Sequence, residues 1–70
     1  MYLTELTEKN LGRVKILVKA NQGQVTISDG GPDDWLVVDT ITEDGGDWYD
    51  LGKSLVQIQA HDGAEFKVTK

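Results

Sequence analysis

The sequence predicts an all-β fold: a compact antiparallel β-sandwich or small barrel of about six to seven strands with hairpin connections. Apolar and polar residues alternate in several short runs, which is the period of a strand with one buried face. Glycine and aspartate separate these runs, as expected of turns. No run has the period of a helix. A length of 70 residues leaves room for one core, so residues 1–70 are predicted to form a single β domain.

The N-terminal part contains one expected strand and a loop. Residues 2–6 are predicted as a leading strand, and residues 7–12 as a loop because they are polar, end in glycine and are too few for a stable helix. The sequence leaves open whether residues 1–12 are loosely attached. From residue 13 to 20 the alternation is regular. The face expected to be buried consists of Val14, Ile16, Val18 and Ala20.

Two hairpins are predicted from the phase of neighbouring runs. A four-residue loop at 20–23, with Gly23 at positive φ, keeps the apolar residues of both flanking strands on one face. A three-residue loop at 61–63, with Gly63 in the left-handed conformation, does the same near the C-terminus. The pairs expected to lie opposite each other are Val18 and Val25, Ile16 and Ile27, Ile58 and Phe66, Val56 and Val68, and Gln57 and Lys67.

The middle of the chain contains a strand that is apolar on both faces. Residues 34–42 are rich in β-branched side chains, and the first half of this run shows no alternation. Such a strand is either central in a sheet or covered on its second face by something else. A short strand at 48–51 follows a turn at 43–46, and Gly52 with Lys53 leads into the last hairpin.

Charge is distributed unevenly along the chain. The net charge is −5, and residues 29–50 contain eight acids and no Lys or Arg. The other residues contain four acids and seven bases, so the two parts carry −8 and +3. The acidic balance opposes approach to nucleic acid or an anionic membrane, and neither is expected as a partner. It favours a basic protein partner or a bound cation.

Metal binding and catalysis have little support in the sequence. The chain has no cysteine and one histidine, His61, so a tetrahedral zinc site lacks ligands. Closely spaced Asp44, Asp47 and Asp50 are weak candidates for calcium, but they do not match the register of a helix-loop-helix calcium loop. His61 falls in a predicted turn without an identifiable catalytic partner. We therefore expect a non-enzymatic protein without a cofactor.

The expected contact surface combines outward apolar residues with the aromatic residues of the acidic stretch. A core of this size supplies only about 3 to 5 kcal/mol of net stability, so association, including a homo-oligomer, is expected, and a modestly stable monomer is the alternative. At least one tryptophan is expected in the core. Trp48 and Tyr49 point to opposite faces, and one of them is expected to be exposed. The predicted interface residues are Leu17, Trp35, Val37, Trp48, Tyr49 and Leu55.

The run WLVVDTITEDG at residues 35–45, followed by residues 50–51, 56–58 and Gly63, resembles small β-sandwich accessory proteins of tailed bacteriophage virions. These are head-decoration or cement proteins and other minor structural components, and the resemblance covers roughly residues 13–69. It implies a domain without catalytic residues, often multimeric, that seats on a capsid or tail lattice. A capsid or tail protein is therefore the expected partner, and the virion the expected location.

Two alternatives stay open beside this interpretation. A carbohydrate-binding module would stack Trp48 or Tyr49 on a sugar beside the neighbouring carboxylates. A calcium-stabilised β domain would use the three aspartates named above. The N-terminus lacks the basic and apolar regions of a signal peptide, and no apolar run is long enough to span a membrane. Synthesis in the cytoplasm is therefore expected.

Overall fold

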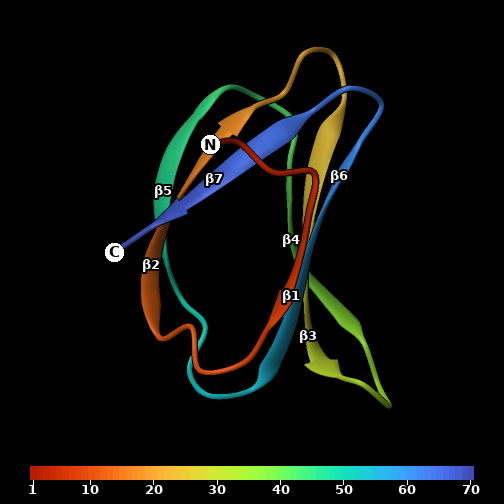
Figure 1. Cartoon of the computed structure of the whole chain (residues 1–70). Coiled ribbons are helices and arrows are strands. Elements are labelled where there is room, and N and C mark those ends of the chain that lie inside the picture. Colours follow the sequence, from red (N-terminus) through yellow and green to blue (C-terminus); the bar gives the residue numbers. More distant parts are fainter.

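The computed structural model describes all 70 residues and contains seven strands and no helix. The strands form two antiparallel sheets, of four and three strands, that face each other as a sandwich (Figure 1). The predicted fold class is thus confirmed. The strands are β1 (Glu5–Glu8), β2 (Arg13–Lys19), β3 (Gln24–Gly31), β4 (Leu36–Ile41), β5 (Gly45–Asp50), β6 (Leu55–His61) and β7 (Glu65–Thr69).

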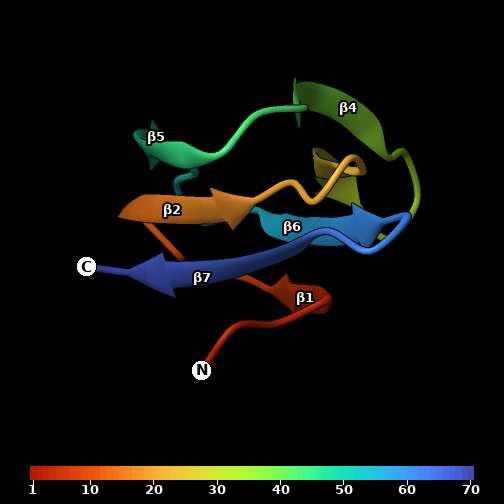
Figure 2. The same cartoon turned by 90° about the horizontal axis from the view of Figure 1, so that it is seen from above.

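The chain passes repeatedly between the two sheets. The larger sheet has the order β1-β6-β3-β4, and the smaller sheet has the order β5-β2-β7. Five of the six connections therefore cross from one sheet to the other, and β3–β4 is the single hairpin. In Figure 2, β4 and β5 lie together along one side of the molecule, while β1 and β7 lie along the opposite side.

The core consists of the inward-facing residues of both sheets, as the period-two pattern predicted. All four residues expected on the inner face of the second strand are buried. The largest side chain with no exposure is Phe66 of β7, and no charged or polar side chain is buried. The twelve core residues are Leu11, Val14, Ile16, Val18, Ala20, Val25, Ile27, Leu51, Val56, Ile58, Ala64 and Phe66.

Both predicted hairpin pairings are wrong. β2 pairs with β5 and β7, and β3 pairs with β4 and β6, so Val18 lies opposite Phe66 instead of Val25. Likewise β6 pairs with β1 and β3, and Ile58 lies opposite Leu6 and Ile27 instead of Phe66. The pattern identified the buried face correctly but not the partner. Two strands joined by a turn present their apolar faces to one core whether they pair in one sheet or face each other across two.

The β2–β3 turn also differs in its backbone from the prediction. Asn21 and Gln22, not Gly23, have positive φ, of 49° and 70°. Gly23 is required for another reason, since a Cβ there would overlap the carbonyl oxygen of His61. At the β6–β7 turn the predicted conformation of Gly63 is confirmed, because this residue has a φ of 91°.

The N-terminal segment joins the two sheets on the β1 and β7 side. Leu3 exchanges two backbone hydrogen bonds with Phe66 of β7, and the amide of Ala60 in β6 donates to the carbonyl of Thr4 at 2.9 Å. The chain then continues into β1, which pairs with β6. On the opposite side no backbone hydrogen bond joins the two sheets, so β4 and β5 each keep one free backbone edge. We call this the open side.

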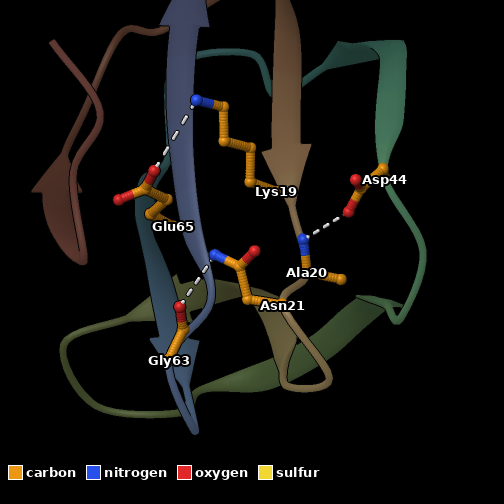
Figure 3. A network of polar contacts seen from close by, with 6 residues as sticks. All are labelled: Lys19, Ala20, Asn21, Asp44, Gly63 and Glu65. Atoms are coloured by element: carbon orange, nitrogen blue, oxygen red, sulfur yellow. Dashed lines mark hydrogen bonds and ion pairs between the residues drawn. The ribbon is translucent and has the colours of Figure 1, made fainter.

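Polar contacts tie the crossing turns together at one end of the sandwich (Figure 3). The Asp44 carboxylate, in the β4–β5 connection, accepts a hydrogen bond of 2.7 Å from the amide of Ala20. The Asn21 side chain donates to the carbonyl of Gly63 at 3.2 Å, which links the other two turns. These contacts anchor connections that run between different sheets.

Candidate binding surfaces

The first candidate surface is built on β4, whose outer edge has no strand partner. Of the two alternatives for residues 34–42, the central strand is therefore excluded, while covering of the second face by another surface stays a prediction. Leu36, Val37 and Val38 expose 64%, 63% and 54% of their surface. Three consecutive apolar residues on a free edge are unusual, since edge strands normally carry charge or proline to prevent unwanted pairing.

The β3–β4 hairpin places Trp35 and Leu55 near the outward side of the sheet, on which Val37 lies. The ring of Trp35 lies against Gly31 so closely that any Cβ at residue 31 would overlap it. Gly31 pairs with Leu55, and Ser28 pairs with Val37. By the alternation of the strands, Leu55 and Val37 lie on the outward face of the larger sheet. We define the hairpin patch by the apolar residues at this end of the sheet: Trp35, Leu36, Val37, Val38 and Leu55.

Exposed carboxylates form the rim of the hairpin patch. Asp33 and Asp34 are exposed in the turn that precedes Trp35. Asp29 accepts a hydrogen bond of 2.6 Å from the amide of Gly30, which has a φ of 93°. The hairpin therefore combines exposed apolar surface with negative charge and has no Lys or Arg of its own.

The second candidate surface is the outer face of the three-stranded sheet. Leu17 is half-buried there because it lies over Gly46, where a Cβ would come within 2.5 Å of it. Lys67 lies directly opposite Leu17, and Lys15 lies opposite Trp48. We define the basic face by Arg13, Lys15, Lys19 and Lys67, together with Leu17 and Trp48.

Not every cation on the basic face is free. The Arg13 guanidinium lies 4.9 Å from the centre of the Trp48 ring, a cation–π distance. Lys19 is 3.9 Å from Glu65, the only ion pair in the chain, and lies 4.3 Å from the Tyr2 ring centre. Lys15 and Lys67 have no acidic partner.

The expectation of one buried tryptophan is wrong. Trp35 is 36% exposed and Trp48 is 47% exposed. The inward positions are filled by aliphatic residues and Phe66, which leaves no place for an indole in a core of twelve residues. Trp48 is on the outer face because its neighbour Tyr49 packs inward against the core.

Tyr49 bridges the open side. Its hydroxyl donates a hydrogen bond of 2.5 Å to the carboxylate of Asp39 in β4. Burial raises the pKa of Tyr49 well above its usual value, and the hydrogen bond to Asp39 and the charges of Asp39 and Asp47 raise it further. Beside this bridge is a hollow of about 210 Å³, lined by Ile16, Val18, Ile41, Glu43, Asp44, Gly45, Gly46, Asp47 and Tyr49.

The predicted calcium candidates do not converge. Asp44 accepts from Ala20 as described, and Asp47 and Asp50 accept hydrogen bonds from the nearby amides of Trp48 and Gly52. No group of three or more acidic or histidine side chains is arranged to hold a metal ion. For the sugar alternative, Tyr49 faces inward with its hydroxyl bonded to Asp39, so Trp48 remains as a stacking ring.

The six predicted interface residues fall on different surfaces. Trp35, Val37 and Leu55 belong to the hairpin patch, Leu17 and Trp48 to the basic face, and Tyr49 to the open side. The prediction omitted Leu36 and Val38, although the loss of alternation in this strand was a signal for them. His61 lies on the larger sheet, with its Nε2 atom 3.1 Å from the hydroxyl of Thr26.

Fold and surfaces together define an all-β sandwich domain with two exposed surfaces of opposite charge. No family model, curated protein or solved structure matches the chain. The chain forms no helix that could cross a membrane.

Proposed function

We propose that this chain is a non-enzymatic structural or interaction protein that binds a protein partner through the hairpin patch. The observation that carries this proposal is the run of three exposed apolar residues on the free edge of β4. Contiguous apolar surface with a polar rim is typical of protein contact sites. The free backbone edge adds unpaired hydrogen-bonding groups that an extended partner segment can use.

The setting that we propose is a bacteriophage virion, with a capsid or tail protein as the partner. The resemblance of residues 35–63 to virion accessory proteins supports this setting. The acidic rim at Asp33 and Asp34 favours a partner whose contact surface is basic, because opposite charges speed docking and select the register.

Capture on the hairpin patch tests this proposal. Purified capsids or tails from the native source are passed over immobilised wild-type protein and over the double variant Leu36→Ser, Val37→Ser. Both side chains are exposed, so their replacement leaves the core intact. The matched control is Glu5→Ser, Thr7→Ser, which changes two exposed residues on the opposite edge strand of the same sheet.

We expect the wild type and the control to retain the particles and the hairpin variant to lose at least about tenfold in affinity, since two contacts of about 1 kcal/mol each are removed. Equal retention by all three proteins would contradict a role for the hairpin patch. Failure of every protein to retain any particle would contradict the virion setting.

A further inference from the structure

We propose that the hairpin patch of one molecule docks on the basic face of a second copy of this chain, in a head-to-tail contact. This inference rests on the proposed function, because it assigns a partner to the same patch. The partner surface is present in the structure itself, and its chemistry matches the hairpin in both apolar and charged character.

The two surfaces are complementary in composition. The hairpin patch has an apolar centre with Asp33 and Asp34 at its rim. On the basic face, half-buried Leu17 lies on the central strand β2 and exposed Trp48 lies on the edge strand β5. Lys67 lies opposite Leu17, and Lys15 lies opposite Trp48. Protein interfaces usually combine apolar contacts with charged groups, and here the charged groups of the two surfaces have opposite signs.

Lys15 and Lys67 are the cations available for this contact. Lys19 is already near Glu65, and Arg13 is near the Trp48 ring. The acids on the same face, Asp50 and Glu65, number two against four bases, so the face keeps a net positive charge. Docking of two acidic residues beside Lys15 and Lys67 would give these lysines the partners that they lack within one molecule.

The location of the two surfaces favours a head-to-tail arrangement over a symmetric one. The β3–β4 hairpin extends from the larger sheet and away from the three-stranded sheet (Figure 1). A symmetric hairpin-to-hairpin contact would bring Asp33 and Asp34 of two molecules together, and like charges at an interface are unfavourable. A head-to-tail contact leaves one free surface of each kind at the ends, so it extends into a ring or a filament.

Charge reversal on each side tests this contact. The hairpin variant is Asp33→Lys, Asp34→Lys, and the basic-face variant is Lys15→Glu, Lys67→Glu. The reversals change the net charge of −5 by +4 and by −4, to −1 and −9. The controls with the same charge changes are Glu5→Lys, Glu8→Lys and Lys9→Glu, Lys53→Glu, all at exposed positions outside both surfaces.

The measurement is the weight-average mass by sedimentation velocity, from about 10 µM to about 1 mM protein, a range that detects contacts of millimolar affinity. For the wild type and both controls, we expect the weight-average mass to exceed the monomer mass of 7.7 kDa at low salt. At about 1 M salt, where charges are screened within about 3 Å, this mass should fall toward that of the monomer. Each reversed variant alone is expected to stay at the monomer mass.

The decisive test is the mass of a mixture of the two reversed variants. In the mixture the lysine-bearing hairpin can dock on the face that carries Lys15→Glu and Lys67→Glu, and the unchanged acidic hairpin can dock on the unchanged basic face, so the mass is expected to rise again. Both variants keep a negative net charge, so overall attraction cannot produce this result. Circular dichroism of each variant establishes that it is folded before the masses are compared.

A wild type that stays at 7.7 kDa up to the highest concentration at low salt would overturn the inference. So would reversed variants that associate as the wild type does, or a mixture that stays monomeric while the wild type associates. Capture of capsids or tails that depends on Leu36 and Val37 would in each case leave the proposed function standing, because it measures a different partner.

Discussion

The bridge between Tyr49 and Asp39 is the one side-chain hydrogen bond that joins β4 and β5 across the open side. Replacing Tyr49 by Phe removes the hydroxyl and keeps the ring. A hydrogen bond to a charged group contributes about 1.5 to 3 kcal/mol when it is buried, but Asp39 is only half-buried and water can replace the hydroxyl. We therefore expect a loss of about 1 kcal/mol in the free energy of unfolding at pH 7.

The same bridge predicts a dependence on alkaline pH. The pKa of Tyr49 is raised in the folded state, first by burial and then by Asp39, so folding stabilises the protonated phenol. The stabilisation is complete below the unfolded pKa of about 10 and is lost as the pH rises above it. The slope reaches at most about 1.4 kcal/mol per pH unit for one proton. Tyr49→Phe has no phenol to ionise and therefore lacks this part of the pH dependence.

Urea denaturation from pH 7 to pH 11 measures both effects. The control Tyr2→Phe makes the same chemical change at a residue that makes no side-chain hydrogen bond to an acid. A second variant, Asp39→Asn, keeps an acceptor for the hydroxyl but removes the charge, so it should reduce the alkaline slope with a smaller loss at pH 7. Equal stability and equal slopes for Tyr49→Phe and the wild type would refute the role of this bridge.

Two further substitutions test how the crossing turns are held. Gly23→Ala is expected to destabilise by at least about 1 to 3 kcal/mol, the usual cost of overpacking, because its Cβ would overlap the His61 carbonyl. Thermal unfolding measures this, and a loss below that of Gly12→Ala, where the space is open but φ is positive, would contradict it. Asp44→Ala leaves the Ala20 amide without its acceptor and should cost about 1 to 3 kcal/mol, whereas Asp44→Asn should retain most of the stability.

The sequence determined the faces of the strands better than their partners. Val14, Ile16 and Val18 are buried as the alternation predicted, and so are Val56 and Ile58. The alternation reports only which side of a strand is apolar, and a hairpin and a crossing turn satisfy it equally. The geometry of the turns contains the missing information: the Gly23 position is fixed by the His61 carbonyl, which comes from the end of β6, 38 residues away in sequence.

The candidate surfaces were predictable to a similar extent. Trp35, Val37 and Leu55 were expected on an interface and do lie near one another on the larger sheet. Their grouping depends on the pairing of Gly31 with Leu55, which joins segments that no local pattern relates. The separation of Leu17 and Trp48 onto the other sheet follows from the crossing connections, which could not be deduced from turn length alone.

The acidic stretch of residues 29–50 lies along the open side of the folded protein. It includes the end of β3, the β3–β4 turn, all of β4 and all of β5, and therefore both free edges of the open side. Free edges are prone to pair with other chains, and charge of one sign on both edges opposes pairing between identical edges. The same charge does not oppose a basic partner. The acids that limit edge-to-edge aggregation would thus also favour basic partners for the apolar residues of β4, as both of our proposals assume.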